Sequence, residues 1–341
     1  MRKMNKQELL ARCTLLIILI GFPMSVFAYQ HVYLPATQGE PKVIDLVARA
    51  PEAGGWSPEI ITVNKGDTIR LRISGHDVVH GFAIGRLGID VGPIIPGEVT
   101  TVEFVADKVG RFTYYCNVWC DPYHYRMRGT LEVVDPAAPD ALLVAEQEPI
   151  LSKTEGPFPE LDIDNPHEAE FYPASQPSAT RGQALVGRIE LPALGDGSTE
   201  LAEVLRSQSP SAVFQAIRAA DSPASLSDEE VWDLVAYLWL TATTPERQAT
   251  GEALYAKNCA ACHGETGGGD GPGGRYQEEP STDFTDARTM AGGSSEIYYA
   301  KTRRGGMGTG MPSWDTIFAK EETWSIVDYL WTFLFKDAKR E

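Results

Sequence analysis

The stretch Tyr115-Cys-Asn-Val-Trp-Cys-Asp-Pro-Tyr-His-Tyr-Arg-Met127 decides how the first part of this sequence folds. It places two cysteines, a histidine and a methionine in the order C-x3-C-x3-H-x2-M. Thiolate, imidazole and thioether are soft ligands, which favour copper over magnesium, calcium or manganese. A mononuclear blue-copper site needs only one cysteine. The second cysteine of this motif would allow two thiolates to bridge two copper ions.

Each copper then needs its own nitrogen ligand, so one more histidine must come from elsewhere. The alternating run Ile69-Arg-Leu-Arg-Ile73 predicts a strand, and the loop Gly75-His-Asp-Val-Val-His-Gly-Phe82 follows it. The loop and the cysteine motif together resemble the CuA domain of cytochrome c oxidase subunit II, and also that of nitrous oxide reductase. The resemblance covers about residues 40–135.

The resemblance implies a complete ligand set for a binuclear CuA centre. Two thiolates would bridge the copper ions, and each ion would take one imidazole. A thioether and a backbone carbonyl would be the weak ligands. Cys116 and Cys120 would supply the thiolates, and His80 and His124 the imidazoles. Met127 would supply the thioether and Val118 the backbone carbonyl.

Other interpretations of these residues stay open. The two cysteines could form a disulfide in an oxidising compartment, or zinc could take the same ligands. Neither alternative needs Met127. His76 competes with His80, but the family loop matches only with His80 as the ligand. Trp56 and Trp119 are expected to pack beside the site, with a role in electron passage as the alternative.

The sequence around the motif predicts an all-β domain over residues 35–135. Short runs of β-forming residues recur between turn signals such as Pro96-Gly97, which indicates a sandwich or barrel. The resemblance implies a cupredoxin-type Greek key. The predicted strands are Glu59–Val63, Ile69–Ile73, Val99–Val105, Arg111–Tyr115 and Thr130–Val134.

A second motif lies in residues 246–341, where Asn258-Cys-Ala-Ala-Cys-His-Gly264 contains C-x-x-C-H. This is the attachment motif of c-type haem. One helical turn places the thiols of Cys259 and Cys262 beside the porphyrin vinyl groups, and the imidazole of His263 reaches the iron. A thioredoxin-like redox pair is the alternative, but it needs no such histidine. We expect an all-α cytochrome c domain here.

The sixth iron ligand is expected to be a methionine, because His/Met ligation raises the potential into the range of electron carriers. Two are available, Met307 and Met311. The resemblance to cytochrome c, in which Met-Pro precedes an aromatic residue, favours Met311 and leaves Met307 as the alternative. The loop after the haem motif resembles that of small bacterial cytochromes c, where Pro272 would present its carbonyl to the N–H of His263.

The residues between the two metal-binding parts predict a linker and a third domain. Residues 136–178 are rich in proline and acidic residues, which favour extended, solvated chain. Residues 179–245 repeat the helix pattern of the haem domain without its haem ligands, because Glu190, Ala193 and Leu194 stand in their places. We interpret them as a haem-less cytochrome c-like module that spaces the metal centres or offers an acidic docking face. Two unrelated helical hairpins are the alternative.

Residues 1–28 predict an export signal: a basic start, the apolar run Thr14–Phe22, and small residues at Ser25-Val-Phe-Ala28. The apolar run is short for a membrane span of about 20 residues, and a retained anchor is the alternative. Haem attachment outside the cytoplasmic membrane agrees with export. We expect a periplasmic protein or one on the outer face of the cytoplasmic membrane. The net charge of −17 argues against nucleic acid as a partner.

This domain order resembles subunit II of cytochrome c oxidases that carry a fused cytochrome c. The resemblance implies that an external donor reduces the haem, the haem reduces CuA, and CuA feeds a separate catalytic subunit I or comparable membrane reductase. The donor would be a small redox partner such as a basic cytochrome c or a quinol-oxidising complex. No catalytic site is expected in this chain. The alternatives are a freestanding exported electron carrier and the electron-input subunit of a CuA-containing nitric oxide reductase.

Overall fold

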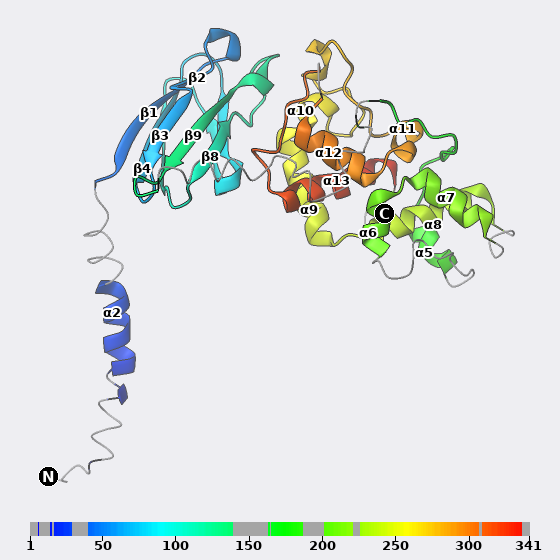
Figure 1. Ribbon diagram of the computed structural model, residues 1–341, viewed down its shortest axis with the longest axis horizontal. Helices are drawn as coiled ribbons and strands as arrows, with labels where there is room; N and C mark the ends of the chain where they lie inside the picture. Colours follow the sequence, from blue (N-terminus) through cyan, green and yellow to red (C-terminus); the bar gives the residue numbers. More distant parts are fainter. Residues whose placement is uncertain are drawn as a thin grey trace.

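An all-β domain lies beside a group of helices in the computed structural model of this chain (Figure 1). The predicted order of an all-β domain followed by all-α ones is confirmed. The structure describes residues 6, 14–15, 17–28, 40–138, 163, 165–186, 201–220, 226–306 and 309–335.

Two sheets form the β domain, with strand orders β2-β1-β4-β7 and β3-β9-β8-β5-β6. All five predicted strands are present as β3, β4, β7, β8 and β9. The strand β5 was not predicted, because it is buried along its whole length and lacks the alternation of a half-exposed strand. The strands are β1 Lys42–Ala48, β2 Trp56–Ser57, β3 Ile60–Asn64, β4 Thr68–Gly75, β5 His80–Ile84, β6 Ile89–Ile94, β7 Val99–Val105, β8 Gly110–Tyr115 and β9 Arg128–Val134.

The core of the sandwich follows from the period-2 pattern of its strands. In β4, Ile69, Leu71 and Ile73 are buried, whereas Arg70 and Arg72 point outward and pair with acidic residues of the neighbouring strands. The strand β9 runs parallel to β3 and antiparallel to β8. It therefore carries the chain from the cysteine motif back into the middle of the second sheet.

The haem domain begins at α9, where the Thr244 side chain accepts a hydrogen bond from the Arg247 N–H and Pro245 occupies the first turn. Thr244 and Pro245 begin the helix that leads into the haem motif. The helices of this domain are α9 Pro245–Asn258, α10 Ala260–His263, the 3-10 turn η9 Gly274–Tyr276, α11 Ala287–Gly292, α12 Ser295–Arg304 and α13 Lys320–Leu334.

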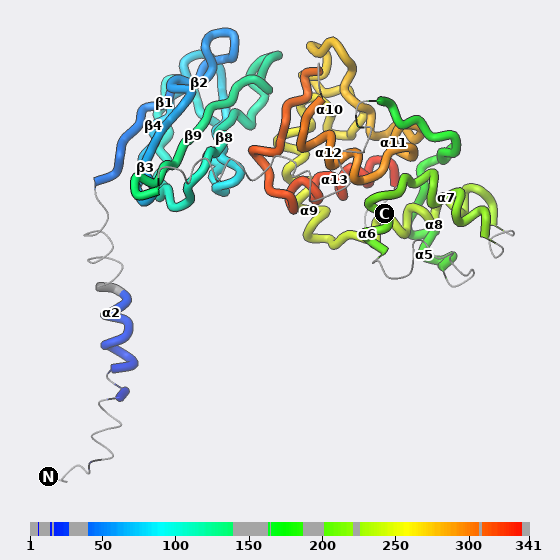
Figure 2. Tube along the Cα trace, in the orientation of Figure 1, coloured from blue at the N-terminus to red at the C-terminus, as the bar shows by residue number. Residues whose placement is uncertain are grey.

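The helices before it pack on the side of the haem domain that faces away from the sandwich, as the green and red segments of Figure 2 show. Trp239 meets Trp331 edge-on at 5.8 Å between ring centroids, and both belong to one continuous core. The prediction that this module spaces the two metal-binding domains is therefore wrong. The helices are α5 Ala179–Leu185, α6 Leu201–Ser207, α7 Pro210–Ala219 and α8 Asp228–Thr241.

The two halves of the predicted repeat share one close helix crossing. In the haem domain α9 crosses α13, and a Cβ on Gly251 would overlap the Ser325 carbonyl oxygen and lie 2.8 Å from the Tyr329 Cβ. In the module α5 crosses α8, and a Cβ on Gly182 would meet the same two atoms of Asp233 and Tyr237. The two halves of the repeat therefore share the close backbone contact that sets the distance between their helices. Glu190, Ala193 and Leu194, which stand in place of the haem ligands, lie outside the described residues.

The end of the predicted linker differs from expectation. Ile163, Ala169 and Ser178 are buried, and the Ala169 N–H donates to the Arg288 carbonyl of α11 at 2.9 Å. This segment is therefore anchored to the helical domains at several buried residues, while most of its other described residues are exposed.

The predicted export signal is described only in part. A π-helical turn spans Ile17–Gly21 and α2 spans Phe22–Ala28. In the part of the chain that the structure describes, no helix has the length and apolar character to cross a membrane. Cys13 and Tyr29 lie outside that part.

We predict that Gly251→Ala destabilises the protein by about 1–3 kcal/mol, because the added methyl group forces α9 away from α13. Urea denaturation followed by circular dichroism measures the effect. Ala253→Gln, at an exposed position of the same helix, serves as the control and should change the free energy of unfolding by no more than about 0.5 kcal/mol. Equal effects of the two substitutions would contradict the tight crossing.

Candidate copper and haem sites

The predicted copper ligands come together at one end of the second sheet. Cys116 follows β8 directly, His80 begins β5, and Met127 ends the short turn η5 His124–Arg126 just before β9. The Cys116 N–H donates to the Met127 carbonyl at 3.1 Å. The sheet therefore ties both ends of the ligand loop together and brings in the distant histidine from a neighbouring strand.

The ligand atoms face one another at short distances. The sulfurs of Cys116 and Cys120 are 3.8 Å apart, and the Cys120 sulfur is 3.5 Å from His124 Nδ1 and 3.9 Å from Met127 Sδ. The Val118 carbonyl oxygen lies 3.1 Å from the Cys116 sulfur. His80 completes a compact group with the two cysteines. All six side-chain and backbone groups predicted as ligands thus border one site.

The orientation of His80 fits a metal ion. Its Nε2 is 2.7 Å from the Asp77 carboxylate, while its Nδ1 is buried and has no hydrogen-bond partner. A carboxylate on one ring nitrogen fixes the tautomer and leaves the lone pair of the other nitrogen for a metal. Because an unpartnered buried nitrogen is otherwise costly, His80 has the environment of a ligand. His76 instead is exposed, with its Nδ1 beside Arg49.

Asp77 is a site residue that the sequence reasoning missed. Its carboxylate also accepts hydrogen bonds from the Ala50 and Val78 N–H groups. Despite partial burial, these bonds and the one to His80 hold the pKa of Asp77 below its usual value. The Asp-x-x-His spacing of the loop was the available signal.

The two cysteines differ in their preferred protonation. The hydrogen bond from the Cys120 thiol lowers the pKa of Cys116 most, and the imidazoles of His124 and His80 add to the effect. Cys116 is therefore stabilised as a thiolate, the form that binds metals.

Trp56 packs beside the predicted copper site, as expected, and also positions the backbone of one of its residues. Its ring meets Phe82 and Tyr114 edge-on at 5.6 and 5.7 Å, and its indole N–H donates to the Met127 carbonyl at 3.2 Å. Trp56 therefore fixes the backbone of Met127, the predicted weak ligand, whose side chain is fully buried.

The haem motif borders a cavity of about 210 Å³ in the helical domain. Its walls include Cys259, Cys262 and His263 from α9 and α10, and Met311 from the segment after α12. Apolar side chains of α13 and of Phe284 form much of the remaining wall. Two thiols, an imidazole and a thioether around one apolar cavity fit a covalently attached haem with His/Met ligation. Met307 lies outside the described residues.

The partner of His263 differs from the prediction. Its Nδ1 lies 3.1 Å from the Thr282 carbonyl, whereas Pro272 is exposed and does not line the cavity. The predicted role of Pro272 is therefore wrong in this structure, because the loop returns to the histidine ten residues later. Burial lowers the pKa of His263 and keeps the imidazole neutral, as a metal ligand must be.

Residues of the supposed linker also line the haem cavity. Ile163 contributes to its wall and packs with Ile297 and Ala300 of α12. Pro166 and His167 border a smaller adjoining cavity that also contains His263 and Met311. No periodic pattern marks these residues, so their position could not be predicted from the sequence.

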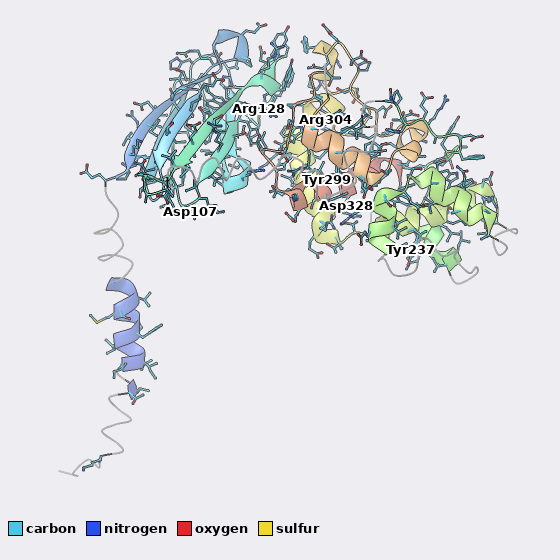
Figure 3. The ribbon with its side chains drawn as sticks, viewed as in Figure 1. Asp107, Arg128, Tyr237, Tyr299, Arg304 and Asp328 are labelled. Atoms are coloured by element: carbon cyan, nitrogen blue, oxygen red, sulfur yellow. The ribbon has the colours of Figure 1, made fainter. Side chains whose placement is uncertain are left out.

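The two metal-binding domains touch directly. Arg128 of β9, labelled in Figure 3 on the side of the sandwich that faces the helices, donates to the Ser313 carbonyl at 2.6 Å and lies over the Trp314 ring. Thr113 of β8 bonds Thr316 at 2.8 Å. These contacts hold the segment that carries Met311 against the two strands that flank the copper loop.

A further ion pair connects the copper loop to the haem helix. Asp90 of β6 pairs with Lys257 of α9, two residues before Cys259. Asp90 also accepts a hydrogen bond from Asn117 at 3.2 Å, and Asn117 follows Cys116. One carboxylate thus bridges the residues next to the two metal-binding motifs.

The comparison with protein families agrees with both motifs. Residues 57–134 match the family described as cytochrome C oxidase subunit II, periplasmic domain, and residues 248–333 match cytochrome c. This chain joins a subunit II-type periplasmic domain to a cytochrome c domain. The two matched families support an electron-transfer role with copper and haem as the redox groups.

Curated relatives match the copper domain. Cytochrome c oxidase subunit 2 of Thermus thermophilus is 37% identical over 81 residues, which are 24% of this chain and 59% of that protein. Nitrous-oxide reductase of Stutzerimonas stutzeri is 36% identical over 89 residues, 25% of this chain and 14% of that enzyme. The chain therefore spans only part of these relatives.

Solved structures give the same kind of match. The periplasmic domain of subunit II of cytochrome oxidase from Bradyrhizobium japonicum is 22% identical, with 32% of this chain and 97% of that chain covered and a TM-score of 0.25. A chain of a heme-copper terminal oxidase dimer is 21% identical, with 38% and 99% covered and a TM-score of 0.25.

We predict that Asp77→Asn lowers copper affinity by about 10- to 100-fold, because the amide orients His80 without the negative charge that raises ligand basicity. Competitive copper titration of the full chain measures it. His80→Ala should lose copper further, while His76→Ala should bind as the wild type does. Copper loss in His76→Ala with retention in His80→Ala would reverse the ligand assignment.

Proposed function

We propose that this chain is the electron-transfer subunit of a terminal oxidase, with a binuclear CuA centre in the sandwich and one covalently bound haem c in the helical domain. The match of residues 57–134 to a family described as a periplasmic domain supports an exported location. An external donor gives one electron at a time to the haem domain, and the copper domain delivers them to a separate catalytic subunit. The two groups supply reversible one-electron chemistry when they are bound.

The observation that carries this proposal is the direct contact between the two redox domains. The segment from Met311 to Thr316 packs on the strands β8 and β9, which lead into and out of the copper loop. The protein's part in the chemistry is to hold both ligand sets rigid and close together. A closed ligand set leaves no substrate position, so the oxygen chemistry belongs to a partner subunit.

The contacts of the haem domain disfavour a role as two independent carriers on a flexible tether. Tyr115 meets Trp314 edge-on at 6.2 Å between ring centroids, and Arg86 donates to the Asp315 carbonyl at 2.9 Å. The resulting small core includes Ala83, Tyr115, Ile317 and Phe318. An interface with a buried apolar centre and satisfied hydrogen bonds favours a fixed arrangement.

The proposed electron path is tested by rapid mixing of the oxidised full chain with a limiting amount of a small reductant. Haem and copper absorbances then report each centre separately. We expect electrons to equilibrate between the centres at a rate that does not depend on protein concentration. A rate proportional to concentration would show transfer between molecules and would contradict the proposal.

A separate test concerns the number of copper ions. The fully loaded chain should contain two coppers for each iron by elemental analysis, and one copper for each iron would indicate a mononuclear site. Cys120→Ser should abolish the mixed-valence paramagnetic signal instead of shifting it, because both thiolates share the unpaired electron.

We further propose that residues 179–245 form a cytochrome c-like module without haem. The shared crossing at Gly182 and Gly251 supports it. Replacing both Cys259 and Cys262 with alanine should remove all covalent haem from the chain, as judged by haem staining after denaturing electrophoresis. Staining that persists in this variant would contradict the proposal of a single haem.

A further inference from the structure

Trp119 lies between the two bridging cysteines and reaches out of the copper loop toward the haem domain. On the copper side, its ring centroid is 5.8 Å from that of the ligand His124. On the haem side, its six-membered ring lies against Gly273. The side chain is half-buried. One indole thus contacts both a copper ligand and a loop of the other domain.

Gly273 lies beside the haem-attachment motif. Its N–H donates to the carbonyl of Ala261 at 2.7 Å, and Ala261 stands between Cys259 and Cys262. The carbons at the far edge of the indole therefore approach the turn of α10 from which the haem is attached. These two contacts of Trp119 join a predicted ligand of one centre to the attachment turn of the other.

Glycine is required at position 273 because of the contact with the Trp119 ring. The backbone conformation there does not require it. Gly273 has φ −74° and ψ −29°, which any residue adopts. A Cβ there would lie 2.5 Å from Trp119 Cζ3 and 2.8 Å from Cη2, which is closer than real carbon atoms approach. The absence of a side chain at position 273 is therefore what allows the indole to seat.

We propose that Trp119 is the residue through which the two redox centres are coupled for electron transfer, and that Gly273 leaves the space into which its ring packs. This proposal rests on the proposed function, since it names the contact through which the two domains exchange an electron. The iron loses the one electron that the copper pair gains. The indole is neither oxidised nor reduced, and no bond forms or breaks.

The other aromatic contact at the interface has a different character. Trp314 is buried and is held by stacking on Phe318 at 5.1 Å, by Arg128 over its ring and by Tyr115 at its edge. None of these three partners is a metal ligand. Trp314 lines the haem cavity together with Met311 but reaches no copper ligand through these three partners, so it anchors the domains, whereas Trp119 contacts the copper ligand His124.

The test uses the holoprotein and two substitutions that disturb the same contact from opposite sides. Trp119→Ala removes the indole, and Gly273→Ala leaves the copper loop chemically intact but displaces the ring. We expect each to slow intrachain transfer severalfold, because electron transfer between two fixed groups weakens when the packed contact between them is loosened. The rate is followed after rapid reduction of the haem.

Tyr123→Leu is the matched control. Tyr123 is an aromatic residue of the same loop, but its ring lies under Arg126 and it borders a groove on the sandwich that also includes Pro51, Glu59, Trp56 and Arg128. Its replacement should leave the transfer rate unchanged. Copper and iron content, both absorption spectra and both reduction potentials are measured for every variant, so that a change in driving force is separated from a change in coupling.

The double variant supplies a readout that does not depend on electron transfer. Gly273→Ala should lower the urea midpoint of the wild-type holoprotein, because the methyl group and the indole compete for one space. In the Trp119→Ala background the same substitution should have little effect on the midpoint or on the rate. Coupling of this kind is expected only for residues in contact.

The outcomes separate this proposal from the function on which it rests. Slow transfer in both single variants, with intact spectra and no additional slowing in the double variant, supports the role of Trp119. Wild-type rates in both single variants with intact spectra overturn it and leave the proposed function in place. A wild-type chain without concentration-independent transfer would overturn the proposed function and this proposal together.

Discussion

The segment that follows α12 fixes how the two metal-binding domains are arranged, because it lines the haem cavity and also contacts the sandwich. It supplies Met311 to the haem cavity, and within a few residues its backbone carbonyls accept hydrogen bonds from Arg86 and Arg128 of the sandwich. It is fixed from the other side by Arg303 of α12, which forms a buried ion pair with Asp315. A buried pair of this kind is costly to break, so neither domain can release the segment alone.

The grouping of the candidate ligands of both centres was predictable from the sequence, because metals demand particular side chains at particular spacings. Cys116, Cys120 and His124 come from one loop, and Cys259, Cys262 and His263 from one turn of helix. The residues that orient these ligands were not predictable to the same degree. Thr282 acts through its backbone carbonyl, which every residue possesses. Asp77 was visible three residues before His80, but that spacing alone does not distinguish it from an ordinary turn aspartate.

The relative placement of the domains was the least predictable feature. An acidic, proline-rich stretch suggested solvated chain between two separate units, yet Ile163 and Ala169 are buried against the haem domain. Docking contacts such as Thr113 with Thr316 or Arg128 with Ser313 join residues about two hundred positions apart. No local periodicity records such contacts, since they depend on how complete domains fit together.

The continuous core that runs from the haem domain into the helices before it has a consequence for biogenesis. The helix α13 offers Leu330 to the haem cavity and Trp331 to Trp239 of α8, so adjacent residues of one helix serve both regions. Where a bound group stabilises a fold, its free energy of binding is shared by everything that unfolds with it. A chain without its haem would therefore lose stability in the helices before the haem domain as well as around the cavity. The haem-less module would extend the surface over which proteases recognise and remove an unfinished molecule.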